Sequence, residues 1–302
     1  MTRSMRRLGA LAATGCLLLL GACSGGSPSA GPGPSISSSP AASSSSAPSE
    51  PSAPSSAPSS AASSSAPVVP PAPKTSACYR LGTAALTRPT NASSPVSCRA
   101  RHNTRTIYVG KLDTVVDGHS IAVDSQTVQR QLATTCPRRL ASYIGGSGTD
   151  RDLSRFNVVW YSPTLQQSDA GADWFRCDLV AFADASRLYD LPRKRPSLLH
   201  VLDRPGALDT YGLCGTAAPG ARGFQRVICD HRHSWRAIDT IGLAGGKKYP
   251  GPSAVRRAGN SRCKDEARAK APDTLKFQYG WEWPSRAQWS RGQHFGYCWA
   301  PT

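Results

Sequence analysis

The chain lacks a hydrophobic run long enough to cross a bilayer. Its longest apolar stretch, residues 8–22, is interrupted by Thr14 and by glycines, and it falls short of the ~20 residues that a membrane-spanning helix needs. Arg3, Arg6 and Arg7 precede this stretch. A basic start followed by a short apolar run is typical of a secretory signal peptide. The sequence therefore predicts export through a signal peptide rather than a transmembrane anchor.

Acidic residues are also scarce. The 302 residues include 19 Asp and Glu against 36 Lys and Arg. One of the acids and four of the bases precede residue 78, so the remainder is formally about +14. No motif singles out the carboxylate pair of a glycosidase. Outside the cytoplasm, such a charge favours anionic lipid, a wall polymer or an acidic protein as partner, and not nucleic acid. A merely solvated basic surface is the alternative.

The apolar stretch ends in Leu20-Gly21-Ala22-Cys23, the arrangement of a lipobox. Cleavage after residue 22 would leave a signal peptide of residues 1–22 and place Cys23, carrying diacylglycerol, at the mature N-terminus. The sequence thus predicts a lipid anchor on the extracytoplasmic face of the cell membrane. Residues 24–73 are almost entirely Ser, Ala, Pro and Gly. Such a segment has little apolar surface to bury, so we predict a disordered linker over residues 23–77.

Cysteine is the one chemically reactive residue type that is abundant. Of the ten cysteines, one lies in the signal and one would carry the lipid; the other eight are Cys78, Cys98, Cys136, Cys177, Cys214, Cys229, Cys263 and Cys298. An even number in an exported protein predicts disulfides, although about a hundred pairings are possible.

An internal repeat narrows these pairings. Two blocks share the spacing of several residues: Val96, Cys98, His102, Val128, Cys136, Trp160, Pro163, Gly171 and Cys177 correspond to Val227, Cys229, His233, Val255, Cys263, Trp281, Pro284, Gly292 and Cys298. We therefore predict two copies of one domain, residues 78–182 and 211–302, joined by a linker over 183–210. The repeat favours disulfides within each copy: Cys78–Cys98, Cys136–Cys177, Cys214–Cys229 and Cys263–Cys298. Bridges between the copies remain the alternative.

Periodicity predicts a mixed α+β fold. Residues rich in Val, Ile, Tyr, Phe and Trp predict strands at 104–109, 156–161, 177–182, 226–229, 275–281 and 295–299. Four apolar residues spaced by four predict a helix over 124–144: Val128, Leu132, Cys136 and Leu140. The equivalent helix, over 253–269, is weaker because Gly259 and Asn260 interrupt it. Each copy is then a few antiparallel strands with one main helix clamped on by its Cys.

These elements resemble the septum formation domain of actinobacterial lipoproteins. The resemblance rests on the Val-x-Cys-x3-His element, the helix with an inner Cys, and the closing Pro284, Trp289, Gly292 and Cys298. It covers both copies, and it implies a role at the division septum. The first copy departs from the pattern, because Ser168 occupies the position of Trp289. Arginines also flank both histidines, where the family pattern has Pro before and an acidic residue after: Arg101, Arg105, Arg232 and Arg236.

Several residues are candidates for binding. His102 and His233 keep the same offset from Cys in both copies, which suits either a recognition residue or a histidine that hydrogen-bonds its own turn. Aromatic residues can stack on sugar rings or fill a core. We expect Trp160 and Trp281 in the core. The residues without a counterpart in the first copy, Trp283 and Trp299, are candidates for an exposed binding face, and Trp289 is a further candidate.

Two kinds of catalytic site are alternatives to a non-catalytic binding protein. A Cys/His hydrolase needs a free thiolate, whereas every cysteine after residue 77 has a counterpart in the other copy. A zinc site at Cys229-Asp230-His231-Arg232-His233 has suitable residue types, but a disulfide at Cys229 would remove one ligand. We therefore predict a non-catalytic envelope protein without metal or cofactor that binds an envelope protein or an anionic wall component. An extracytoplasmic enzyme of cell-wall metabolism is the alternative.

Overall fold

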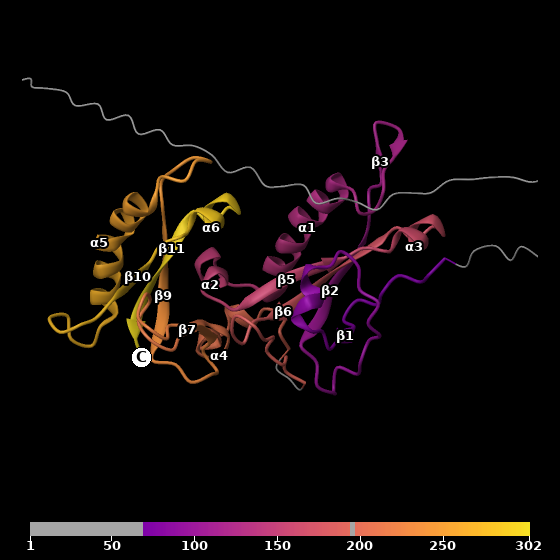
Figure 1. Ribbon diagram of the computed structural model, residues 1–302. Helices are drawn as coiled ribbons and strands as arrows, with labels where there is room; N and C mark the ends of the chain where they lie inside the picture. The colour runs from indigo at the N-terminus through magenta and orange to yellow at the C-terminus, as the bar shows by residue number, and fades with distance from the viewer. Residues whose placement is uncertain (1–68, 194–196) are drawn as a thin grey trace, which may run out of the picture. The chain divides into compact units, whose positions relative to one another are not determined.

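The computed structural model describes residues 69–193 and 197–302, which form a mixed α+β fold with antiparallel sheets (Figure 1). The predicted signal peptide, the lipid-anchor Cys23 and most of the predicted linker over 23–77 lie outside these residues. Within the described part of the chain, no helix combines the length and hydropathy needed to span a membrane.

The first sheet has four strands in the order β1-β2-β6-β5, each antiparallel to its neighbour. Their bounds are β1 (Cys78–Tyr79), β2 (Thr104–Lys111), β5 (Phe156–Tyr161) and β6 (Trp174–Ala181). Helix α1 (Gln126–Ile144) lies across one face of this sheet (Figure 1). It begins at Ser125, whose hydroxyl accepts a hydrogen bond from the Val128 N–H, as an N-cap does. The helix predicted over 124–144 is therefore confirmed.

Alternation along β6 divides the two faces of this sheet. Phe175 and Cys177 face α1, where they pack with the buried Val128, Leu132 and Cys136. The intervening side chains point to the opposite face, because successive residues of a strand alternate. That face carries Trp174, Arg176 and Asp178, all buried.

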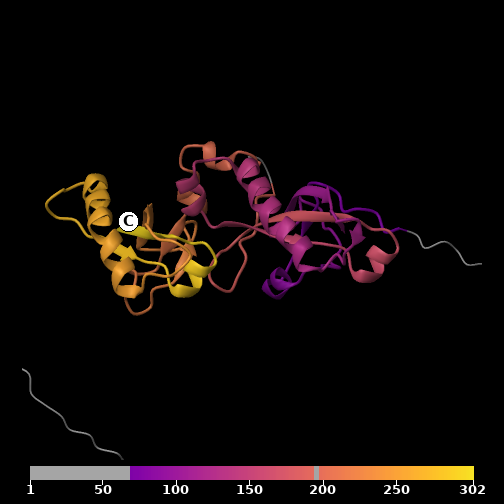
Figure 2. The same ribbon diagram turned by 90° about the horizontal axis from the view of Figure 1, so that it is seen from above.

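The second sheet has five strands in the order β10-β11-β9-β7-β8. Their bounds are β7 (Leu213–Gly215), β8 (Arg226–Ile228), β9 (Trp235–Gly242), β10 (Gly280–Glu282) and β11 (Phe295–Pro301). Helix α5 (Pro252–Lys270) packs against β9, β10 and β11 (Figures 1 and 2). Apart from β8, the order β7-β9-β11-β10 repeats that of the first sheet. Two short helices with capping boxes, α3 (Leu165–Asp169) and α6 (Arg286–Ser290), also correspond. The two copies remain a prediction, which this shared order supports.

Smaller elements fill the connections. They are η1 (Thr83–Thr87), the hairpin strands β3 (Val115–Val116) and β4 (His119–Ser120), α2 (Gly148–Asp152), η2 (Val201–Asp203) and α4 (Ala207–Tyr211). The β3–β4 turn consists of Asp117 and Gly118, with φ of 51° and 78°. Positive φ at both central residues is what a tight two-residue hairpin requires.

The two sheets share buried residues. The Leu213 N–H donates to the Leu153 carbonyl at 2.7 Å, and both side chains lie in one core cluster with Trp299. Conversely, Ile228 packs in a cluster with Ile144. The segment predicted as a linker over 183–210 also contributes to that cluster through Leu191, Leu198, Val201 and Leu202. This segment is therefore part of the core rather than a polar connection.

The helix predicted over 253–269 is confirmed in spite of its weak pattern, and one predicted strand differs from the structure. Helix α5 is continuous through Gly259 and Asn260, because Gly259 is buried against the Trp281 ring and a Cβ there would overlap that ring. The strand predicted over 275–281 begins only at Gly280. The Asp273 carboxylate accepts hydrogen bonds from the N–H groups of Leu275 and Lys276, which hold the preceding residues in a turn instead.

Candidate binding surface

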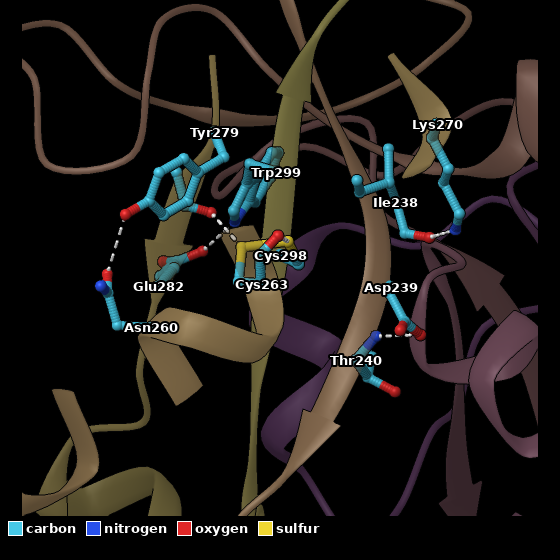
Figure 3. The surroundings of a disulfide bond; sticks show 11 residues. Ile238, Asp239, Thr240, Asn260, Cys263, Lys270, Tyr279, Glu282, Cys298 and Trp299 are labelled. Atoms are coloured by element: carbon cyan, nitrogen blue, oxygen red, sulfur yellow. Dashed lines mark hydrogen bonds between the residues drawn. A yellow bond between two sulfur atoms is a disulfide. The ribbon is translucent and has the colours of Figure 1, made fainter. Parts of the chain in front are cut away.

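All eight cysteines after residue 77 are paired in the structure. The bonds are Cys78–Cys98, Cys136–Cys177, Cys214–Cys229 and Cys263–Cys298, the four pairs that the repeat predicts. Figure 3 shows the last of them, which ties α5 to β11 and is fully buried. Each helix is thus bonded to the long strand beneath it. Neither a thiolate nucleophile nor a cysteine ligand is available at these positions while the disulfides are intact.

The residues considered for a zinc site are engaged in other contacts. Cys229 is bonded to Cys214, and the Asp230 carboxylate accepts a hydrogen bond from the Tyr189 hydroxyl at 2.8 Å. His233 Nδ1 lies 2.7 Å from the His231 carbonyl oxygen. Within residues 69–193 and 197–302, no group of three His, Cys, Asp or Glu side chains is arranged to hold a metal ion.

The two repeated histidines make the same local bond. His102 Nδ1 lies 2.9 Å from the Ala100 carbonyl oxygen, which matches the bond of His233 to the residue two positions before it. His102 is 1% exposed, whereas His233 is half-buried. This geometry favours a structural role in the turn after the disulfide over ligand recognition.

Two of the three candidate tryptophans lie in the core. Trp299 and Trp289 are 0% and 1% exposed, so the prediction of an exposed binding face is wrong for Trp299 and no ligand can reach Trp289. The Trp299 indole N–H donates to the Glu282 carboxylate at 3.1 Å (Figure 3). Trp289 stacks on His294 and donates to the Gly246 carbonyl. Both rings find hydrogen-bond partners inside the second sheet and its loops, which is why they can be buried.

Trp283 is the candidate that reaches the surface. It is 37% exposed, and the guanidinium of Arg256 lies 6.0 Å from its ring centroid. Arg256 belongs to the first turns of α5, so the aromatic ring adjoins the outer side of that helix.

The outer side of α5 is strongly basic. The helix buries Val255, Gly259, Cys263 and Ala267, one residue every four. Its exposed positions carry six basic residues against one acid, Asp265; the basic residues are Arg256, Arg257, Arg262, Lys264, Arg268 and Lys270. We call these six side chains the α5 basic face. Arg262 and Lys270 at its edges donate to backbone carbonyls of β9, and Arg268 pairs with Asp265. The spacing of the buried residues by four is the signal in the sequence that indicates this face, and it was not used in the prediction. Arg268 and Lys270 also lie in the last turn, where cations interact favourably with the helix dipole.

A pocket lies beyond the end of α5. It has a volume of about 490 Å³, and its lining includes Lys270, Lys276, Phe277 and the Ala300–Pro301 end of β11. The Lys270 ammonium donates to the Ile238 carbonyl at 2.6 Å (Figure 3), which fixes it beside β9. The α5 basic face therefore has an aromatic ring, Trp283, at one end and a basic pocket at the other.

The fold and the surface together define a class: cystine-bridged α+β proteins in which a basic helix packs on an antiparallel sheet. The family is established by sequence. The septum formation family model matches residues 147–298, about half of the chain, so the protein belongs to the septum formation family. The match runs from the N-cap of α2 to the last cysteine and crosses the boundary predicted between the two copies. No curated protein and no solved structure matches the chain.

Proposed function

We propose that this protein is a lipid-anchored, extracytoplasmic member of the septum formation family that acts by binding an anionic polymer of the cell wall. The α5 basic face carries the proposal. Its six cations follow a helix of 19 residues, a length of about 28 Å. A polyanion lying along such a helix can contact several cations at once, whereas a compact acidic protein would meet fewer of them.

The chemistry of the described cysteines supports binding over catalysis. Every cysteine from Cys78 onward is held in a disulfide, and disulfides persist in the oxidising compartment that the lipobox predicts. A lipid on Cys23 and a Ser/Ala/Pro tether would hold the two sheets outside the membrane, where wall polymers lie. Family membership connects this binding to septum formation.

Co-sedimentation of the full-length protein, in detergent micelles, with isolated cell walls tests the proposal. The charge-reversed variant Arg257→Glu/Lys264→Glu should bind about tenfold more weakly at low salt, because both side chains are exposed on the basic face. High salt should likewise weaken the binding of the parent protein to the walls. The matched control, Arg257→Lys/Lys264→Arg, keeps the charge and should bind like the parent. Equal binding of the reversed variant and the control would refute the role of α5, and an acidic envelope protein would replace the wall as the partner to test.

The anchor is tested separately by Cys23→Ala. We expect the substituted protein to move from the membrane fraction to the medium or the wall fraction. Retention in the membrane fraction would contradict lipid anchoring without affecting the binding proposal.

A further inference from the structure

The face of the first sheet opposite α1 holds a buried ion pair beside a cavity. Arg176 and Asp178 on β6 are 3% and 0% exposed, and Arg176 Nε lies 3.1 Å from Asp178 Oδ2. The Thr106 hydroxyl donates to the other carboxylate oxygen at 2.7 Å. The guanidinium lies between two tyrosine rings, 3.9 Å from the centroid of Tyr79 and 4.8 Å from that of Tyr161. These contacts hold Arg176 rigidly in one position.

The cavity has a volume of about 610 Å³, which lies within the usual range of small-ligand sites. Its lining includes Lys74, Tyr79, Asn91, Gln167, Trp174 and Arg176. The segment that follows the predicted tether, residues 71–77, forms one wall. Among residues 69–193 and 197–302, no acidic side chain is part of the lining.

The two amide side chains of this cavity have occupied acceptor oxygens and spare donors. The Trp174 indole N–H is buried and has no partner among the residues that the structure describes. The Asn91 amide oxygen already accepts from Arg176 Nη2 at 2.9 Å and from the Ser93 N–H. The Gln167 amide oxygen accepts from the Thr164 N–H in the capping box of α3. The NH₂ groups of both amides and Arg176 Nη1 make no hydrogen bond within residues 69–193 and 197–302.

The charged residues of the lining are Lys74 and Arg176, of which Arg176 is paired with Asp178. Spare donors beside these cations suit a ligand with several acceptors. A carboxylate supplies about four acceptor positions and matches a guanidinium edge. Burial raises the pKa of Asp178 to about 6, against the opposing effects of Arg176 and Thr106. A ligand that binds beside Arg176 would therefore lie near the carboxyl group of Asp178, which is already poorly solvated.

We propose that this cavity binds a small carboxylate of the cell wall, held by Arg176, Trp174, Gln167 and Asn91. The proposal rests on the proposed envelope function and deepens it, because it assigns a second, specific site apart from α5. Two sources share this chemistry: a sugar acid of the wall glycan and the carboxyl end of a wall peptide.

Isothermal titration of the full-length protein separates these sources. The probes are N-acetylmuramic acid with its methyl ester, and D-alanyl-D-alanine with its C-terminal amide. We expect one of the acids to bind at least tenfold more tightly than its uncharged derivative, since hydrogen bonds to a charged group account for such a factor. The acid that binds identifies the source. Failure of both acids, or equal binding of acids and neutral derivatives, would overturn the proposal.

Two substitutions locate the site. Trp174→Phe removes only a donor that has no partner in the free protein, and Gln167→Glu keeps the capping oxygen but replaces the spare donor by a negative charge. Each should weaken binding of the acid about tenfold or more. The matched control is Gln288→Glu, which makes the same change in the equivalent capping box of α6. Equal effects of Gln167→Glu and Gln288→Glu would overturn the assignment.

The outcome is independent of the wall co-sedimentation. Wall binding through α5 without carboxylate binding refutes this cavity site and leaves the proposed function intact. Carboxylate binding without salt-dependent wall binding refutes the proposed function and leaves the cavity site intact.

Discussion

Gly259, inside helix α5, should be important for the stability of the second sheet region. In an ordinary helix interior, replacing Gly by Ala stabilises by about 1 kcal/mol. Here a Cβ at position 259 would overlap the ring of Trp281. That ring is 7% exposed, and its indole N–H donates to the Val255 carbonyl at 3.4 Å. Gly259→Ala should therefore destabilise the protein, against the propensity of the helix.

The size of the stability loss caused by Gly259→Ala follows from the space around Trp281. A Cβ at Gly296 on β11 would also overlap the ring, so the ring is confined on both sides. The Cys263–Cys298 bond holds the helix and that strand together and prevents them from separating freely. Overpacking a core costs about 1–3 kcal/mol, and expelling a buried Trp costs about 3–5 kcal/mol. After subtraction of the gain in propensity, we expect a net loss of about 2 kcal/mol.

Urea unfolding followed by circular dichroism measures this loss as a lower midpoint at unchanged slope. The matched control is Ser261→Ala, two residues further along the same helix, where the side chain is exposed. That change should stabilise by up to about 0.6 kcal/mol through propensity alone. In a Trp281→Phe background, the smaller ring should reduce the cost of Gly259→Ala by about 1 kcal/mol or more. Stabilisation by Gly259→Ala, or an unchanged cost in that background, would refute the packing argument.

Three further predictions concern the core. Replacing both cysteines of the Cys136–Cys177 bond by Ala should cost about 1 kcal/mol more in unfolding free energy than the same change at Cys214–Cys229, because the closed loops span 41 and 15 residues. In the same urea assay, Trp299→Ala should cost about 3–5 kcal/mol and Trp283→Ala less than about 1, since only the second ring is exposed. The raised pKa of Asp178 should appear as a carboxyl NMR titration near pH 6. Its contribution to stability is complete below the unfolded pKa, and about 1 kcal/mol of it is lost between about pH 5 and pH 7.

The sequence alone predicted what depends on local periodicity. The four-residue spacing in the first helix is confirmed by the burial of Val128, Leu132 and Cys136. The strand predicted over 156–161 coincides with β5. The disulfide pairs followed from the predicted repeat, because equivalent positions of a repeat are expected to be bridged in the same way.

Tertiary contacts decided the rest. The second helix, predicted over 253–269 from a weaker pattern, is confirmed as α5: propensity assigns Gly259 a cost, whereas the fold uses its missing side chain to admit the Trp281 ring. The exposure predicted for Trp299 was wrong because nothing in the local sequence shows that Phe224 and Glu282 will meet its ring and its N–H. The turn at Pro272-Asp273 was the one local signal that could have shortened the last predicted strand.

The two sheets differ most where they carry their candidate binding features. Trp160 lies opposite Cys177 in the first sheet, and Trp281 lies opposite Cys298 in the second. At this common register, Arg176 of the first sheet corresponds to Tyr297 of the second, and the Asp178 position is taken by Trp299.

An ion pair beside a cavity in one sheet is therefore replaced by packed aromatic rings in the other. The helices also differ, but here the second sheet has the more highly charged element: α1 carries three basic residues and α5 carries six. The features shared by both sheets, namely the disulfides, capping boxes and strand order, maintain the fold. The features that are not shared are free to acquire separate ligands. The two proposals place a small acid at the first sheet and a polyanion at the second, and they predict that substitutions in the cavity and on α5 will affect binding independently.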